Sequence, residues 1–442
     1  MRKLFGTDGI RGVAGEYPLD APTTYAVGVA LAKWVNQHHA EPEVVIGMDT
    51  RESGPWIAEQ VAGGLASLGV KARFAGLIST PGLAYTARTG PFAAGVMISA
   101  SHNPFKDNGI KVIDHSGFKL PDEQEHELEK DIFAFIESKA ETPAQKLTVD
   151  EGLDQAYISF LASTMPLRLD GMRIVLDAAN GAASHLGPKL FEKLGAKVDC
   201  IGCSPDGRNI NLNCGSLHLD NLQQRVIATG ADAGVAFDGD ADRALFVSHT
   251  GKFVDGDATM FITALPLAAA GRLKDVVATV MSNLGLERAL EAHGIGLVRT
   301  AVGDKYVLQE MLRRDAPLGG EQSGHVIFRD YATTGDGMLT ALRLFEVMRA
   351  TGQDLDTLSR DLKIYPQLLV NVKFKHKRPL EELDLANREI RLAEEEFGNA
   401  GRIVVRFSGT EPVARVMVEG PTEERVNHVA HAIANAIRTE LS

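Results

Sequence analysis

The chain has 442 residues, which is long enough for three or four domains of ordinary size. Hydrophobic residues make up 44% and charged residues 24%, a composition that excludes a disordered chain. The net charge of −12 argues against a nucleic-acid partner, and no apolar stretch approaches the roughly 20 residues of a membrane helix. The start of the chain has no apolar signal segment, so we expect a cytoplasmic protein without a membrane partner.

Strands and helices alternate along most of the chain, which predicts an α/β fold. An apolar strand that ends in polar residues is followed by a helix three times, over 43–68, 173–194 and 275–293. A further strand is expected over 70–74. The repeated pattern predicts three similar α/β domains with mixed sheets, and the charged stretch 137–152 is expected to close the first.

The C-terminal part of the chain has a different pattern. Residues 367–375 alternate like an antiparallel strand, 403–407 and 414–419 resemble a hairpin, and 426–441 has helical apolar spacing. We therefore predict a smaller α+β domain here. The predicted domains span 1–152, 153–255, 256–367 and 368–442. Because ligands of α/β sheets gather at the carboxyl ends of strands, and most of the polar segments below follow strands, we expect one central cleft.

Ser101 is a candidate nucleophile or carrier of a transferred group. It follows an apolar strand over 96–98, and proline cannot simply continue a strand, so Pro104 enforces a turn. A hydroxyl group at a strand end, beside the imidazole of His102, is suited to either role. The alternative is that Ser101 caps the next segment and that His102 is a solvated loop residue.

Three carboxylates, Asp238, Asp240 and Asp242, directly follow an apolar strand over 234–237. Unit charges about 4 Å apart repel by roughly 4 kcal/mol per pair at an effective dielectric constant of about 20. The cluster must therefore bind a cation or become protonated. Oxygen ligands in a tight loop favour Mg²⁺, and we expect one ion per chain.

Two other acidic loops are alternatives to a magnesium site. A calcium-binding EF-hand has glycine at its sixth position and glutamate at its twelfth, where this chain has Arg243 and His249. A haloacid-dehalogenase-type phosphatase also has an aspartate after a strand, but its fifth position is usually threonine or valine and not Asp242. Such a sugar phosphatase would use Asp238 as its nucleophile.

A phosphate-binding turn is predicted near the C-terminus. A strand ends in Ser408, Gly409 and Thr410, and Arg406 and Arg415 flank this turn. Backbone N–H groups of such a turn bind anions, and the planar arginine side chain matches phosphate. The alternative is an ordinary hairpin with exposed arginines, but a cationic hairpin is more telling in an acidic protein.

A sugar-binding loop is predicted between two glycines that flank Glu321 and Ser323. A carboxylate and a hydroxyl group are suited to binding vicinal sugar hydroxyls. A second glycine-hinged polar turn contains Gly303, Asp304 and Lys305.

The four segments together predict phosphoryl transfer on a sugar, because they supply a hydroxyl carrier, a metal, a phosphate clamp and a polyol clamp. Lys111, His102 and His325 are the candidate general acids or bases by residue type. The sequence contains no phosphate-binding loop of nucleotide hydrolases, no zinc-protease motif and no α/β-hydrolase elbow.

The cysteines are close together in the sequence. Cys200, Cys203, Cys214 and His218 loosely imitate the spacing of a zinc site. Val198 and Cys200 alternate on one face of a strand, which favours a buried small side chain instead. We expect three reduced thiols.

Four segments resemble the signature segments of the α-D-phosphohexomutases and occur in the order found in that family. They are residues 100–111, 238–243, 320–325 and 406–412, so the resemblance covers essentially the whole chain. The opening segment 5–12, the segment 213–216 and Gln322 resemble the branch of the family that acts on glucosamine phosphates.

The resemblance implies an isomerase whose four domains, in chain order, carry a phosphoserine, a metal, the sugar site and the phosphate site. The phosphoserine, Ser101, would give its phosphoryl group to glucosamine 6-phosphate and form a bound 1,6-bisphosphate. Return of the other phosphoryl group would leave glucosamine 1-phosphate, which feeds UDP-N-acetylglucosamine and cell-wall precursor synthesis. A preference for mannose or glucose phosphates is the alternative within the family.

The resemblance also implies a role for each site residue. The metal ligands would be Ser101, Asp238, Asp240 and Asp242. Lys111 and His325 would lie near the reacting oxygens, and Arg11 and His102 would support Ser101. Substrate binding would involve Arg243, Gly303, Asp304, Lys305, Glu321, Ser323, Arg406, Ser408, Gly409, Thr410 and Arg415.

Lys305 departs from the family pattern, because relatives often have arginine at this position. Lysine keeps the charge but loses the planar fork, which puts the phosphate contact of this loop in doubt. The resemblance further suggests a homodimer and a glucose or glucosamine 1,6-bisphosphate activator. It also suggests a kinase or a bisphosphate donor that first phosphorylates Ser101.

Overall fold

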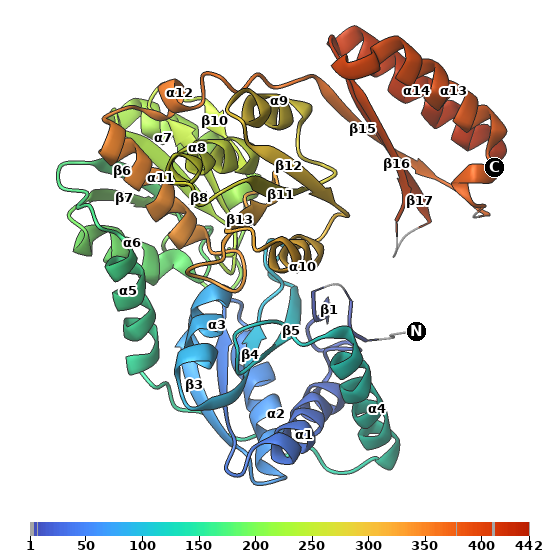
Figure 1. Cartoon of the computed structure of the whole chain (residues 1–442). Helices are drawn as coiled ribbons and strands as arrows, with labels where there is room; N and C mark the ends of the chain where they lie inside the picture. Colours follow the sequence, from blue (N-terminus) through green and yellow to red (C-terminus); the bar gives the residue numbers. More distant parts are fainter. Residues whose placement is uncertain (1–3, 7, 377, 409–411, 442) are drawn as a thin grey trace.

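The computed structural model describes residues 4–6, 8–376, 378–408 and 412–441. Within these residues the chain forms four successive regions, each with its own sheet (Figure 1). The first three regions combine sheets with helices on their faces, and the C-terminal region is smaller. The predicted fold class is therefore confirmed.

The first region is built on a five-stranded mixed sheet. Its strands are β1 (Ile10–Val13), β2 (Glu43–Met48), β3 (Lys71–Leu77), β4 (Phe92–Ile98) and β5 (Asp107–Asp114), and its helices are α1 (Ala21–His38), α2 (Gly54–Ala66), α3 (Thr80–Thr89) and α4 (Asp122–Ser138). The order is β1-β5-β4-β2-β3; β4, β2 and β3 are parallel, whereas β5 and β1 are antiparallel to their neighbours. All seven residues of β4 are buried, as expected of a central strand.

The second region repeats the mixed sheet. Its strands are β6 (Arg173–Asp177), β7 (Lys197–Ile201), β8 (Ala233–Phe237), β9 (Ala244–Ser248) and β10 (Phe253–Val254), and its helices are α5 (Gly152–Thr164), α6 (Ala183–Lys193), η1 (Gly215–Leu217) and α7 (Asp220–Thr229). The order is β10-β9-β8-β6-β7. Strand β8 is parallel to β6 and antiparallel to β9, so the chain turns sharply at the end of β8.

The third region has a four-stranded sheet. Its elements are α8 (Gly256–Ala269), β11 (Asp275–Thr279), α9 (Leu284–Ala292), β12 (Gly296–Thr300), α10 (Asp304–Arg314), β13 (Leu318–Gly320), β14 (Val326–Phe328), α11 (Gly337–Thr351) and α12 (Leu355–Leu358), with the strand order β12-β11-β13-β14. One apolar core runs from Tyr157 to Leu362 and includes side chains of both the second and third regions. This shared core fixes the loops of the two regions relative to each other.

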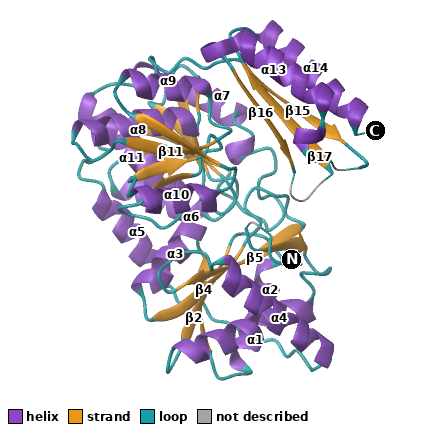
Figure 2. Cartoon of the chain, turned by 45° about the vertical axis from the view of Figure 1, so that its right-hand side comes forward, coloured by secondary structure: helices purple, strands orange, loops and turns teal. Residues whose placement is uncertain are grey.

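The C-terminal region has its own sheet and its own core. Its elements are β15 (Gln367–Lys373), η2 (Leu380–Glu382), α13 (Asp384–Phe397), η3 (Gly398–Ala400), β16 (Arg402–Phe407), β17 (Val413–Glu419) and α14 (Glu423–Glu440). The sheet is antiparallel in the order β15-β17-β16, and α13 and α14 lie together on one face of it (Figure 2). The predicted hairpin and final helix are both present.

The observed elements differ from the predicted ones mainly at their ends. Helix α2 begins at Gly54, three residues before Ile57, where the sequence predicted its start, because Pro55 is well suited to the first turn of a helix. Strand β3 continues to Leu77, beyond the predicted end at residue 74. Strand β5, which follows the turn at Pro104, was not predicted. The domain limits proposed from the sequence stay a prediction.

The cysteines differ from the expectation. Strand β7 ends at Ile201 and Gly202 turns the chain with a φ of 60°, which brings the Cα atoms of Cys200 and Cys203 within 6.1 Å. The two residues form a disulfide, so the prediction of reduced thiols is wrong for them, whereas Cys214 is free. Within the described residues, no group of cysteines and His218 is close enough to hold a metal.

No helix in the described part of the chain combines the length and the apolar character needed to cross a membrane.

Candidate functional site

Ser101 follows β4 in a turn that holds it in the left-handed region, with a φ of 51°. This backbone conformation costs a non-glycine residue about 1–3 kcal/mol, so neighbouring groups must stabilise it. Its carbonyl oxygen accepts hydrogen bonds from Asn211 Nδ2 at 2.9 Å and Arg51 Nη2 at 3.0 Å. Its buried hydroxyl donates to Asp238 Oδ2 at 2.5 Å and lies 3.3 Å from His102 Nδ1.

A buried ion pair between Asp49 and Arg51 supports this turn from the end of β2. Ser99 Oγ donates to Asp49 Oδ2 at 2.6 Å and accepts the backbone N–H of Ser101 at 2.9 Å. Arg51 also donates to the carbonyl oxygen of Asn103 at 2.6 Å. Sequence reasoning missed Asp49 and Arg51 as site residues, although they form the polar end of a predicted strand.

Asp238, Asp240 and Asp242 lie in the turn after β8, and one oxygen of each lies within 4.8 Å of the others. All three are buried. Gly239 is required between them, because a Cβ atom there would lie 2.4 Å from the carbonyl oxygen of Ser101. The absence of a side chain thus allows the serine turn and the carboxylate turn to meet.

This carboxylate cluster fits a divalent cation. Oδ1 of Asp240 and Oδ1 of Asp242 are buried and accept no hydrogen bond in the described structure. Burial, together with the negative charges of Asp242 and Asp240, raises the pKa of Asp238 well above its ordinary value. A cation would satisfy the unpaired oxygens and offset the repulsion, and hard oxygen ligands suit Mg²⁺.

Lys111, on β5, faces the carboxylate cluster with its ammonium group buried. Its Nζ lies 2.9 Å from Asp240 Oδ2, 3.0 Å from Asp8 Oδ2 and 4.0 Å from Asp242 Oδ2. Burial alone would lower the pKa of Lys111, but the charges of Asp240, Asp8 and Asp242 outweigh it and raise the pKa. Thr80, at the start of α3, donates a further hydrogen bond to Asp240.

His325 approaches Asp242 from the third region. Its Nδ1 lies 3.6 Å from Asp242 Oδ2, and its Nε2 accepts the backbone N–H of Gly335 at 3.0 Å. Burial alone would raise the pKa of Asp242, but His325, Lys111 and Arg243 lower it well below its ordinary value.

His102 also lies beside the hydroxyl group of Ser101. Burial and the nearby charges of Arg243 and Arg11 lower the pKa of His102 to about 4. Its Nδ1 is 3.4 Å from Arg243 Nη1. The His102 imidazole is therefore neutral at neutral pH.

The predicted sugar loop and the turn at residue 303 contact each other. Glu321 Oε1 accepts the backbone N–H of Gly303 at 3.1 Å, and Ser323 Oγ donates to Glu321 Oε2 at 3.4 Å. Gly303 has a φ of 133°, a conformation that favours glycine, and Asp304 then begins α10. Lys305 Nζ is paired with Asp122 of the first region at 2.7 Å.

A cavity of about 460 Å³ collects most of these groups between the first three regions. The predicted site residues that line it are Arg11, Ser101, His102, Asp242, Arg243, Gly303, Asp304, Lys305, Glu321 and His325. Two further charged residues, Asp8 and Lys119, also line it. Asp8 lies in the opening segment 5–12, in which the sequence analysis gave it no role of its own, and Lys119 carries no motif that could have identified it.

The predicted phosphate turn lies on the C-terminal sheet and does not line this cavity in the described structure. Arg406 on β16 and Arg415 on β17 are directly opposite in the antiparallel register. Burial and the neighbouring charge of Arg415 lower the pKa of Arg406. Ser408 donates its backbone N–H to Val413 at 2.8 Å, whereas Gly409 and Thr410 lie outside the described residues.

Four family models match the chain in order. The descriptions are those of phosphoglucomutase/phosphomannomutase: α/β/α domain I at residues 2–139, domain II at 155–251, domain III at 255–365 and the C-terminal domain at 369–436.

Curated relatives match over the full length. The chain is 60% identical to the phosphoglucosamine mutase of Solibacter usitatus over 442 residues, covering 100% of this chain and 99% of the relative. It is 49% identical to the phosphoglucosamine mutase of Koribacter versatilis over 450 residues, covering 99% and 97% of the two chains.

Solved structures share the fold. A phosphoglucomutase/phosphomannomutase family protein from Burkholderia thailandensis superposes with a TM-score of 0.82 at 24% identity, covering 99% of this chain and 98% of the other. Aspergillus fumigatus N-acetylphosphoglucosamine mutase, in complex with GlcNAc-6P and magnesium, gives a TM-score of 0.66 at 19% identity, covering 100% and 96%.

Proposed function

Because the chain belongs to the phosphoglucomutase/phosphomannomutase family, we propose that it interconverts glucosamine 6-phosphate and glucosamine 1-phosphate, with Ser101 as a phosphoserine. The activity is that of an isomerase, which moves a phosphoryl group between two oxygens of one sugar. The relatives of highest identity above bear the name of this activity. The product, glucosamine 1-phosphate, would feed the synthesis of UDP-N-acetylglucosamine and cell-wall precursors.

The observation that carries the proposal is the hydrogen bond from Ser101 Oγ to Asp238, inside the buried carboxylate cluster. A phosphoryl group on this oxygen would add about −1.5 to −2 charges beside three carboxylates. Such a charge needs a cation, so Asp238, Asp240, Asp242 and the Ser101 group would hold Mg²⁺ together. When bound, the ion would supply positive charge to the oxygens of the transferred group.

In the first transfer, the bond between Ser101 Oγ and phosphorus breaks while a bond forms between phosphorus and a sugar hydroxyl oxygen. The hydroxyl proton passes to a base on the protein, and Ser101 Oγ takes up a proton as it leaves phosphorus. Lys111, His102 and His325 are the candidate general acids and bases. The raised pKa of Lys111 keeps it protonated and suits it to donate, whereas His102 is neutral beside Ser101. Arg11 and Arg243 line the same cavity and would compensate negative charge on the moving group.

In the second transfer, the bisphosphate presents its other phosphoryl group to Ser101 Oγ. The bond between phosphorus and the sugar oxygen breaks, and this oxygen takes a proton. Ser101 Oγ gives up its own proton as its bond to phosphorus forms, and the phosphoserine is restored. The sugar must reverse its orientation between the two transfers, so its binding groups must accept both orientations. Glu321 and Ser323 would bind the sugar hydroxyls, and Gly303, Asp304 and Lys305 would complete this wall of the cavity.

The non-reacting phosphate would bind at the C-terminal hairpin. Like charges directly opposite on a sheet are unfavourable, yet Arg406 faces Arg415. A bound phosphate would turn this repulsion into attraction to both guanidinium groups. Ser408, Gly409 and Thr410 would add hydroxyl and backbone donors. The same proposal includes a homodimer and activation by glucose or glucosamine 1,6-bisphosphate. It also includes a kinase or bisphosphate donor that first phosphorylates Ser101.

Turnover of glucosamine 6-phosphate, mannose 6-phosphate and glucose 6-phosphate, followed by ³¹P NMR, tests the substrate. We expect the highest kcat/KM for glucosamine 6-phosphate, and a clear preference for a neutral sugar would contradict the proposal. Phosphopeptide mapping of the same protein should find phosphate on Ser101. Phosphate on another residue would contradict the mechanism.

The same measurements separate the mutase from a sugar phosphatase that uses Asp238. Both oxygens of Asp238 are engaged, because Oδ1 accepts the backbone N–H of Arg243 at 3.2 Å and Oδ2 accepts from Ser101. A phosphatase would release free phosphate even after Ser101→Ala. We expect no such release.

A further inference from the structure

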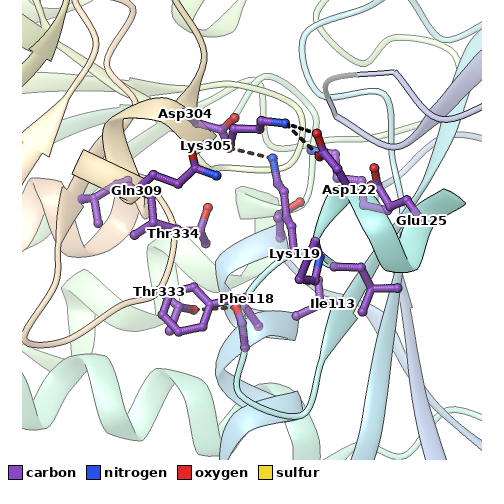
Figure 3. A pocket seen from close by; sticks show the side chains of 18 of the residues that line it. Ile113, Phe118, Lys119, Asp122, Glu125, Asp304, Lys305, Gln309, Thr333 and Thr334 are labelled. Carbon is purple, nitrogen blue, oxygen red and sulfur yellow. Dashed lines mark hydrogen bonds and ion pairs between the residues drawn. The ribbon is translucent and has the colours of Figure 1, made fainter. Parts of the chain in front are cut away.

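Lys119 joins the first and third regions at the wall of the cavity. Its Nζ lies 2.5 Å from Asp8 Oδ1 in the first region and 2.6 Å from Asp304 Oδ2 in the third. Figure 3 shows the side chain of Lys119 extended toward Asp304, with the interaction marked. We call Asp8, Lys119 and Asp304 the charge bridge.

The backbone of Lys119 is held in place by the strand that carries Lys111. After β5, the chain turns and pairs back against it, with Lys119 opposite Ile113 in an antiparallel bridge. Leu120 donates its N–H to the carbonyl oxygen of Val112 at 3.2 Å, next to Lys111 in the sequence. Lys119 is thus fixed to the strand that positions Lys111.

Asp8 links the charge bridge to the proposed catalytic groups. Its second oxygen lies 3.0 Å from Lys111 Nζ and pairs with Arg11. At the other end, Asp304 directly follows Gly303, whose backbone N–H donates to Glu321. The charge bridge therefore connects the groups that face Ser101 with the loop that faces the sugar.

The charges of the bridge depend on one another. Burial alone would lower the pKa of Lys119, but Asp8 and Asp304 raise it. Burial alone would raise the pKa of Asp8, but Lys111, Lys119 and Arg11 lower it well below its ordinary value. Without the ammonium group of Lys119, the carboxylates of Asp8 and Asp304 would face each other across the domain boundary.

Open space lies on both sides of the bridge. A second cavity of about 440 Å³ separates the first and third regions, and Figure 3 shows its lining. Lys119, Asp304 and Lys305 line both this cavity and the one that contains Ser101. Because both faces of the charge bridge border cavities, side-chain packing against it is incomplete. The spacing of the first and third regions therefore depends more on these electrostatic contacts than on packing at this place.

We propose that Lys119 is a positioning residue for phosphoryl transfer. It sets the distance between Lys111 and Arg11, in the first region, and the loop at 303–306, which lines the sugar side of the cavity. This inference rests on the proposed function for its kinetic consequence, whereas the role of Lys119 in joining the two regions does not depend on the substrate. The competing role is direct binding of a substrate phosphate by Lys119.

Amide hydrogen exchange of the unliganded protein tests the joining role without any substrate. In Lys119→Met, which keeps the length of the side chain but removes its charge, we expect segments 5–12 and 302–308 to exchange about 3- to 10-fold faster. Lys33→Met is the matched control, because Lys33 forms a 2.9 Å ion pair with Asp131 in the same region. Unchanged exchange of both segments in Lys119→Met would overturn the proposal.

Steady-state kinetics with whichever phosphosugar the wild type turns over tests the positioning role. We expect Lys119→Met to lower kcat about 10- to 100-fold, because small misplacements of catalytic groups have effects of this size. KM should change less than about threefold, and Lys119→Arg should recover most of kcat. A raised KM with an unchanged kcat would show direct substrate binding and overturn the proposal.

A double-mutant cycle with Asp304→Asn makes the test specific. If Lys119 acts through Asp304, the combined variant should lose no more kcat than the worse single variant. Additive losses would contradict coupling through the bridge. Failure of the wild type to isomerise any of the three sugar phosphates would contradict the proposed function and leave the exchange test of Lys119 in force.

Discussion

The two ends of the proposed site differ in how their charged side chains are arranged. At the Ser101 end, Asp238, Asp240 and Asp242 are buried. The Ser101 hydroxyl lies 2.5 Å from Asp238, and Lys111 and His325 lie between 2.9 and 4.0 Å from Asp240 and Asp242. At the C-terminal end, two half-buried arginines of like charge face each other across β16 and β17.

The Ser101 end of the site is organised before substrate arrives. Contacts to Ser101 come from three loops of two regions, and the shared core of the second and third regions fixes the carboxylate turn and the sugar loop. The C-terminal region has its own core, and its arginine pair becomes favourable when an anion binds. We infer that chemistry depends on the first end and capture of phosphate on the second.

Ser101→Ala is expected to have the largest effect. It removes the oxygen that would carry the phosphoryl group, and we expect kcat to fall by about 10³-fold or more. Quenched-flow or ³¹P NMR assays, with phosphopeptide mapping in parallel, measure the loss. Isomerisation that persists in this variant would show that the Ser101 end is not the reactive one.

Asp240→Asn tests the metal-binding half of the same end. We expect kcat to fall about 10²- to 10³-fold, because one carboxylate ligand and the ion-pair partner of Lys111 are lost together. A chelator should abolish wild-type activity, and added Mg²⁺ should restore it. Asp199→Asn, which removes an exposed ion pair with Arg225 in the same region, should be nearly neutral. Wild-type activity in chelator would argue against the metal.

Arg406→Gln tests the C-terminal end. We expect KM to rise about 10- to 100-fold with a smaller change in kcat, because the lost contact would hold a phosphate in both the ground and transition states.

Arg425→Ala is the matched control for this end, since Arg425 pairs with Glu396 in the same region. If Arg406→Gln instead lowered kcat and left KM unchanged, the C-terminal end would take part in the chemistry. This result would contradict the proposed difference between the two ends.

Asp257→Asn should have the smallest effect on activity, because it acts on the stability of the joint that carries the C-terminal region. Asp257, on α8, accepts the N–H of Asn283 at 2.7 Å, and Arg402 of the C-terminal region donates to the carbonyl oxygen of Ser282 at 2.8 Å. Burial and the charge of Asp255 raise the pKa of Asp257 to about 7.

The sign of this pH effect follows from the raised pKa. Folded Asp257 keeps a proton that the unfolded chain releases near its ordinary pKa of 3.8, so its contribution is complete below that pH and is lost as pH rises through about 7. Between pH 5 and 8, the free energy of unfolding of the wild type should fall by about 1–3 kcal/mol relative to Asp257→Asn. A constant difference in denaturant titrations across this range would contradict the assignment.

The fold class and the chemical character of each turn could be predicted from the residues alone. Buried strand patterns located β4 and β8, and the residues after them, Ser101 and the carboxylates of 238–242, show their chemistry through side-chain type alone. The polar C-terminal hairpin was equally visible, because alternation and an Arg-rich turn are local signals. The spacing of residues along the sequence did not predict strand β5 or the Cys200–Cys203 disulfide, because both form only where the chain turns back on itself.

Which of these groups are neighbours depends on how the whole chain folds. Ser101 meets Asp238 across 137 residues of sequence, and Lys119 meets Asp8 across 111 and Asp304 across 185. A lysine in a turn after a strand has no distinguishing pattern of its own, because its role comes from carboxylates that distant segments supply. The pKa values of the site follow the same rule, since burial and opposing charge are properties of the assembled cavity and not of any one segment.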